Sequence, residues 1–228
     1  MKQDASPQEL NASTLGRTPI RGMDAIDDQT VMAFATPVIN VRWSGMDAMN
    51  DALRMIILDA ERRTEGVVRS NVGGWHSTTG FLELGTDVVA ELRGRICDLV
   101  TEVRARVLPA DQGSNAARFH LEGWANVLRT GQYNTMHCHP NAVWSGVYYV
   151  TDNPTAGTHP FSGKLELIDP RPGAALEYRE ASSLYGRFML SPVAGQIVIF
   201  PSWLNHIVHP YFGESPRISV AFNVNPMG

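Results

Sequence analysis

The sequence predicts a mostly β protein with α-helices, whose core is a double-stranded β-helix (a cupin-like jelly roll) with N-terminal helices packed on one outer face. Two observations support this fold class. Apolar residues recur at helical spacing in the first half of the chain, whereas the second half consists of short β-rich runs separated by Gly, Pro and Asn turns. Because jelly rolls hold ligands between their two sheets, we expect a site there.

The length and composition predict the domain organisation. A chain of 228 residues and 25.1 kDa can bury one core, so a single domain is expected over residues 31–228. Its helical part is predicted at about 44–110 and its β core at about 115–225. Residues 1–30 are polar and without periodicity, which predicts a flexible N-terminal arm. A homodimer, in which a partner subunit orders this arm, stays open.

The elements follow in order along the chain. Residues 31–43 are the first strand candidate, and Pro37 favours a sheet edge or a bend there. Apolar residues recur every three or four positions from Met46 to Arg63 and from about Thr86 to Val107, which predicts two amphipathic helices. The segment SNVGGWHS between them is predicted to be a loop. Later strands are predicted at 118–130, 142–151, 164–168, 196–200 and 217–224.

Composition excludes several classes of partner. A net charge of -4 and a pI near 6.0 give no basic footprint for nucleic acid. No apolar run is long enough to span a membrane, and the polar N-terminus lacks the apolar segment of a secretory signal. Two cysteines make no disulfide framework. We therefore expect a cytoplasmic protein that binds neither nucleic acid nor membrane.

Two histidines lie two positions apart in the stretch 124–151, which is predicted to form a strand, a turn and a strand. On an extended backbone His137 and His139 would point to the same face, where two imidazoles can converge on one metal ion. A third ligand must come from elsewhere. His206 and His209 follow GQIVIFPSW, which is typical of a buried strand that ends at a turn. Each histidine alone is more often structural, but the four near two turns favour a metal site.

The last predicted strand has one polar and one apolar face. Arg217, Ser219, Ala221 and Asn223 alternate with apolar residues. One interpretation is a surface strand whose polar face lies in water. The other places Arg217 and Ser219 inside the roll, where the guanidinium would hold a carboxylate through two hydrogen bonds.

The order of these residues resembles the 2-oxoglutarate/Fe(II)-dependent dioxygenases. In that superfamily a His-x-Asp/Glu pair and a distal His hold iron, and a later Arg, often in Arg-x-Ser, binds the distal carboxylate of 2-oxoglutarate. The matching residues here are His137-Cys138-His139, His206 and Arg217-Ile218-Ser219. Further motifs resemble a small bacterial and phage branch: F-x-T-P at 34–37, GWHS at 74–77, HxHP at 137–140, SGVYY at 145–149, DPR at 169–171 and FPSWLxHxV at 200–208. The resemblance covers roughly residues 31–225.

The resemblance implies an oxygenase that uses Fe(II), 2-oxoglutarate and O₂. Such an enzyme would oxidise an unactivated C–H of a small-molecule substrate by hydroxylation, desaturation or cyclisation. The implied metal ligands, which are also the catalytic set, are His137, His139 and His206. The implied 2-oxoglutarate-binding residues are Arg217, Ser219, Asn126, Tyr133 and Asn223. Weaker candidates for the substrate pocket are Trp75, His76, Tyr148 and Trp203.

Position 139 departs from the superfamily, which usually has Asp or Glu there. We expect His139 to be a true third ligand, because its spacing from His137 is that of the family. Two other readings stay open. His139 could support the site while water or a carboxylate such as Glu166 completes it, or the metal could be one other than iron.

Two other classes of function also stay open. One is a three-histidine jelly-roll metalloenzyme that does not use 2-oxoglutarate, which would have no need of the Arg217 clamp. The other is a non-enzymatic module that binds a small ligand, against which the histidine cluster argues.

Overall fold

The computed structural model describes residues 35–107, 119–153, 159–173 and 187–226. The predicted N-terminal arm, residues 1–30, lies outside this part of the chain. Residues from Thr36 onward form one compact unit. Within the described ranges, no helix is both long enough and apolar enough to cross a membrane.

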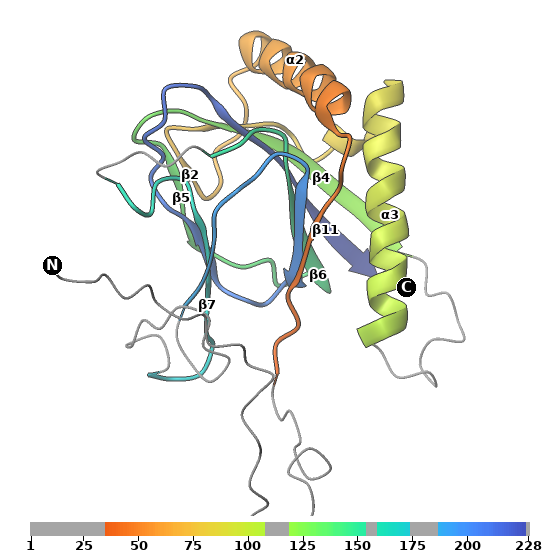
Figure 1. The fold of residues 1–228 in the computed structure, drawn as a ribbon, viewed down its shortest axis with the longest axis vertical. Coiled ribbons are helices and arrows are strands. Elements are labelled where there is room, and N and C mark those ends of the chain that lie inside the picture. The colour runs from red at the N-terminus through yellow and green to blue at the C-terminus, as the bar shows by residue number, and fades with distance from the viewer. Residues whose placement is uncertain (1–34, 108–118, 154–158, 174–186, 227–228) are drawn as a thin grey trace, which may run out of the picture. The chain divides into compact units, whose positions relative to one another are not determined.

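Two antiparallel sheets form the core, which confirms the predicted fold class (Figure 1). The larger sheet has six strands in the order β1 (Ile39–Arg42), β9 (Gln196–Pro201), β6 (Trp144–Tyr149), β11 (Arg217–Pro226), β4 (Phe119–Leu128) and β3 (Trp75–His76). The smaller sheet has five strands in the order β2 (Asn71–Val72), β5 (Tyr133–His137), β10 (His206–Val208), β7 (Leu165–Ile168) and β8 (Arg187–Leu190).

The predicted helices cover the outer face of the larger sheet. They are α2 (Asp47–Arg63) and α3 (Asp87–Val107), and the short 3-10 helix η1 (Phe81–Glu83) lies between them in the chain. Figure 1 shows both helices on the side of β4 and β11, away from β5 and β7. Their apolar stripes pack with one face of the larger sheet into the main core. A second, smaller core lies between the sheets, where Val198 and Phe200 of β9 meet Leu165 and Leu167 of β7.

β11 divides its side chains between these two environments. Ile218, Val220, Phe222 and Val224 join the helix-side core. The alternate residues face the other sheet, and Arg217 and Ser219 are each only 2% exposed. The interpretation of this segment as a surface strand is therefore wrong, and the interior placement is confirmed.

The predicted loop SNVGGWHS instead crosses from one sheet to the other. β2 pairs with β5 in the smaller sheet, and β3 pairs with β4 in the larger one. Gly73 adopts a φ of 73°, which favours glycine, and a Cβ on Gly74 would lie 2.3 Å from Leu128 Cδ2, so a larger residue there would displace the Leu128 side chain. Strands of two residues have no readable alternation, which is why the sequence did not predict them.

Ile57→Asp should destabilise the protein by more than about 3 kcal/mol, because Ile57 is fully buried under the sheet and an aspartate there would be an unpaired charge. Urea unfolding followed by circular dichroism measures this. Met55→Asp is the matched control, since Met55 lies on the same helix but is 73% exposed, and it should change stability by less than about 0.5 kcal/mol. Equal stability of the two variants would mean that α2 does not pack as described.

Candidate active site

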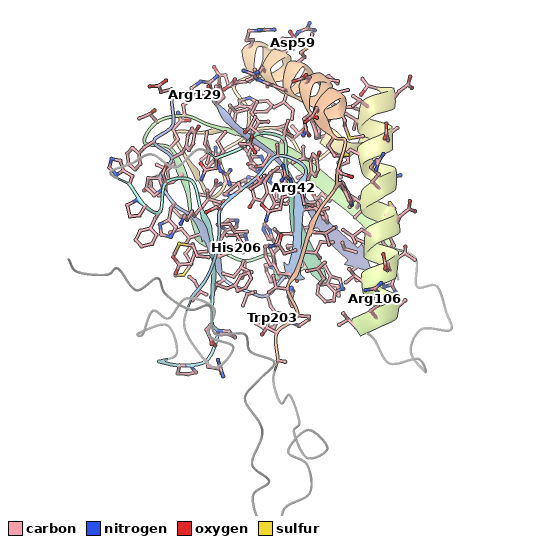
Figure 2. All side chains as sticks on the ribbon, viewed as in Figure 1. Arg42, Asp59, Arg106, Arg129, Trp203 and His206 are labelled. Carbon is pink, nitrogen blue, oxygen red and sulfur yellow. The ribbon has the colours of Figure 1, made fainter. Side chains whose placement is uncertain are left out.

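A cavity of about 510 Å³ lies between the two sheets. Its walls come from β4, β6 and β11 of the larger sheet and from β5, β7 and β10 of the smaller one. Figure 2 shows His206 in the interior between the sheets. Both histidine-bearing stretches and the polar row of β11 therefore open into one space.

Three of the predicted histidines meet in this cavity. His137 is the last residue of β5 and His206 the first of β10, and the two are opposite each other in the strand pairing. His139 lies two residues beyond β5, and its backbone N–H donates to the carbonyl of Ser202 (2.8 Å). The potential ligand atoms of the three imidazoles all lie within 4.8 Å of one another. This set could hold one metal ion.

The path of the chain to this cluster differs from the prediction. The stretch 124–151 holds three strands rather than two, because β5 lies between β4 and β6. The pairing of β5 with β10 also shifts register. Asn134 pairs with Val208 and His137 pairs with His206, so three positions along β5 correspond to two positions along β10. Such a bulge turns both side chains toward the cavity. A strict alternation would have put Asn134 outside, which is why this cavity residue was missed.

Backbone carbonyls orient two of the imidazoles. His137 Nδ1 lies 2.7 Å from the Thr135 carbonyl oxygen, and His206 Nδ1 lies 3.0 Å from that of Leu204. A carbonyl only accepts, so each Nδ1 donates and each Nε2 keeps the lone pair that a metal needs. Burial lowers the pKa of His206 to about 3 and that of His139 to about 4, and it also lowers the pKa of His137. All three are therefore neutral at pH 7, the form that binds metal.

Glu166 does not complete the histidine cluster. Its carboxylate Oε2 lies 2.7 Å from His209 Nε2. On β7 it alternates with Leu165, which lines the cavity, and it therefore faces the other side of the smaller sheet. The reading in which Glu166 supplies the third ligand is wrong, and His209 also lies outside the cluster.

A buried guanidinium occupies another part of the cavity. Arg217 Nε donates to the Gly163 carbonyl (3.0 Å), and the guanidinium carbon lies 5.3 Å from the centre of the Tyr149 ring. No carboxylate of the described residues lies within ion-pair distance of Arg217. The Tyr149 hydroxyl is also buried without a hydrogen-bond partner in this part of the chain. Burial raises the pKa of Tyr149 to about 12, so the phenol stays protonated and its O–H can donate a hydrogen bond.

These groups fit a carboxylate ligand. Burial lowers the pKa of Arg217, although the nearby Tyr149 and Tyr211 act in the opposite direction. A buried charge without a counter-ion is costly, and an anion that enters the cavity would remove that cost. Ser219 and Asn126 lie next to Tyr149 on the cavity side of the larger sheet. Ser219 is opposite Tyr149 in β6 and opposite Asn126 in β4, and both Ser219 and Asn126 line the cavity.

Two other residues predicted to bind 2-oxoglutarate lie elsewhere. Tyr133 is not among the residues that line the cavity. Asn223 lines it but lies six residues along β11 from Arg217, roughly 20 Å at ~3.3 Å per residue. It therefore does not share the carboxylate that Arg217 would hold.

Of the four weaker substrate-pocket candidates, only His76 lines the cavity. The prediction for Trp75 and Tyr148 is wrong, because both face the helices: Trp75 Nε1 donates to the Thr64 carbonyl (3.0 Å), and the Tyr148 hydroxyl donates to Asn50 Oδ1 (2.6 Å). The prediction for Trp203 is also wrong. It is 51% exposed and lies at an edge of the domain (Figure 2).

His76 stacks on a second aromatic residue that the sequence analysis missed. The His76 and Trp124 rings are 5.4 Å apart and nearly parallel, with an interplanar angle of 11°, and Trp124 lies 5.6 Å from the His139 ring. Burial, followed by the nearby Arg69 and His137, lowers the pKa of His76. The signal for Trp124 was its alternation with Asn126 on β4, and Tyr149 could have been found from its alternation with Tyr148.

The comparisons with known proteins agree with this geometry. Residues 122–223, from β4 to β11, match the family described as "Putative 2OG-Fe(II) oxygenase". No curated protein matches the sequence.

Solved structures with the same fold include a Pseudomonas putida prolyl-4-hydroxylase, at 16% identity over 85% of this chain and 94% of that one, with a TM-score of 0.61. A Trichoplax adhaerens prolyl hydroxylase, in complex with a hypoxia inducible factor peptide fragment, is similar at 11% identity over 83% of each chain, with a TM-score of 0.59. HygX from Streptomyces hygroscopicus, with nickel and 2-oxoglutarate bound, is similar at 13% identity over 85% of this chain and 84% of that one, with a TM-score of 0.58.

At these identities the structural likeness concerns the fold. The family match concerns the sequence of the β core itself, and that core brings together the three histidines and Arg217. The β core of this chain is therefore similar in sequence to the 2-oxoglutarate- and Fe(II)-dependent oxygenase family, over residues 122–223.

Proposed function

We propose that His137, His139 and His206 hold Fe(II) and that Arg217 binds the distal carboxylate of 2-oxoglutarate, assisted by Tyr149 and Ser219. One observation carries this assignment. A guanidinium that is 2% exposed, and that has no carboxylate partner in the described residues, opens into the same cavity as three neutral imidazoles. A cationic pocket beside a metal site suits an anion that can reach both.

Each residue has a defined task in this proposal. His137 and His206 would bind the metal through Nε2, and the three imidazoles together would leave coordination positions for other ligands, as a catalytic metal site requires. Because His139 is neutral, the three imidazoles would leave the ion's charge unbalanced, and the 2-oxoglutarate dianion would offset it. The Tyr149 hydroxyl would donate a hydrogen bond to the carboxylate that Arg217 binds. Held by these residues, iron and 2-oxoglutarate would supply, together with O₂, an oxidant able to remove a hydrogen atom from a C–H.

The substrate is proposed to be a small molecule. The cavity of about 510 Å³ lies within the range of small-ligand pockets, and HygX has been solved with hygromycin B bound. The walls are Trp124, Val147 and Phe200 as well as polar groups, and such apolar surroundings keep bulk water from the reacting C–H. Hydroxylation is the proposed outcome.

Succinate release tests the proposal. The full chain, incubated in air with Fe(II) and 2-oxoglutarate, is expected to form succinate slowly without substrate and faster with a correct one. Omission of the metal or addition of a chelator should stop the release. If the iron-loaded protein neither binds nor turns over 2-oxoglutarate, the assignment of Arg217 fails, and a three-histidine enzyme without this co-substrate becomes the better reading.

A further inference from the structure

The cavity ends, away from Arg217, in a second group of polar side chains. Asn223 of β11 is opposite Glu122 in β4 and opposite Ser145 in β6, and all three line the cavity. We call these three residues the Glu122 end. Ser145 Oγ donates to Asn223 Oδ1 (2.8 Å). This bond uses one lone pair of the amide oxygen, so Asn223 Oδ1 and Ser145 Oγ can each still accept a hydrogen bond from a ligand.

The histidine cluster lies beside the middle of this wall. Trp124, whose ring is 5.6 Å from that of His139, is opposite Ala221. Ala221 lies between Arg217 and Asn223 along β11, about 13 Å from the first and about 7 Å from the second at ~3.3 Å per residue. A co-substrate held between Arg217 and the metal therefore leaves the Glu122 end for the molecule that is oxidised.

The charge at this end is unbalanced. Glu122 is half-buried, and its carboxylate has no hydrogen bond or ion pair within the described part of the chain. It is also the sole carboxylate among the described residues that line the cavity. Its neighbours Asn223 and Ser145 are neutral. In a partly desolvated cavity an opposite charge is attracted more strongly than in water.

We propose, on the basis of the function proposed above, that the substrate carries a cationic amine and that Glu122 binds it, with Asn223 and Ser145 completing the contact. The stacked rings of Trp124 and His76 give the rest of the substrate a flat surface next to His139. Arg69 lines the cavity on the His76 side, so its charge repels the amine toward Glu122. The substrate thus lies with its positive end away from both Arg69 and Arg217.

A matched set of three probes tests this inference: 4-phenylbutylamine, 4-phenylbutanol and 4-phenylbutyrate, which differ mainly in the charge of one end. Equilibrium dialysis is carried out anaerobically with the full chain loaded with Fe(II) and 2-oxoglutarate. The wild type is expected to bind the amine about tenfold tighter than the alcohol, and the carboxylate least. Glu122→Gln should weaken amine binding about tenfold while leaving alcohol binding unchanged.

Asp98→Asn is the control, because it removes one negative charge from an exposed position on α3 and should leave the preference for the amine intact. Glu122→Asp should restore part of the preference. The inference is overturned if the wild type binds the three probes equally or binds none of them. It is also overturned if Glu122→Gln keeps the preference for the amine. Binding of 2-oxoglutarate, measured in the same samples, tests the proposed function separately and should be equal in wild type and Glu122→Gln.

Discussion

Arg217→Lys should weaken 2-oxoglutarate binding at least 30-fold while Fe(II) binding stays nearly unchanged. Lysine keeps the charge but loses the planar fork that can bind a carboxylate through two hydrogen bonds. It also loses Nε–H, which donates to the Gly163 carbonyl and fixes the guanidinium. Breaking one half of a buried, hydrogen-bonded charge pair costs about 2–5 kcal/mol, or roughly 30-fold to several-thousand-fold in affinity.

Anaerobic titration of 2-oxoglutarate into the iron-loaded proteins, followed by equilibrium dialysis, measures this effect. Arg217→Ala should be weaker still. Arg106→Lys is the matched control, because Arg106 lies on the exposed face of α3 and pairs with Glu102 (Figure 2). The assignment of Arg217 fails if Arg217→Lys binds 2-oxoglutarate as tightly as Arg106→Lys does.

His206→Ala should lower Fe(II) affinity by more than about 100-fold, because removal of a ligand exceeds the 10–100-fold effect of removing a group that only supports one. His206 is 5% exposed, so alanine also leaves a hole, and His206→Gln, which fills it, should lose the metal equally. Iron content after dialysis measures binding, and thermal melts show whether each variant is folded.

His209→Ala is the control for this prediction, since His209 contacts Glu166 outside the cluster. It should retain iron. A folded His206→Gln variant with wild-type iron content would remove His206 from the ligand set, whatever the result for His137.

The period-two pattern of β11 predicted that Arg217 and Ser219 share one face opposite the apolar residues, but it left open whether that face lies in water or in the interior, and the structure buries it. The same rule explains two errors. Trp75 and Tyr148 are each one position away from the cavity residues His76 and Tyr149, and neighbours on a strand face opposite sides. The motifs indicated the right dipeptides, but strand boundaries were needed to choose the face.

The histidine cluster was predicted by residue but not by geometry. His137 and His139 were expected to converge because residues two positions apart on an extended strand point to the same face, yet β5 ends at His137. His139 reaches the site through a turn that is held by a backbone hydrogen bond to Ser202, a contact between segments far apart in the chain. The Asn134 bulge likewise depends on pairing with β10. No local pattern encodes such contacts.

The paired tyrosines of β6 limit how this scaffold can be re-engineered. Tyr148 holds the helical layer through Asn50 of α2, and its neighbour Tyr149 faces the guanidinium in the interior. One peptide unit joins the two, so a shift that suits one displaces the other. The outer helices are therefore not an exchangeable cover. A chimera with helices from another jelly roll would have to supply an equivalent hydrogen-bond acceptor for Tyr148. Without one, a shift of Tyr148 would also displace Tyr149 next to Arg217.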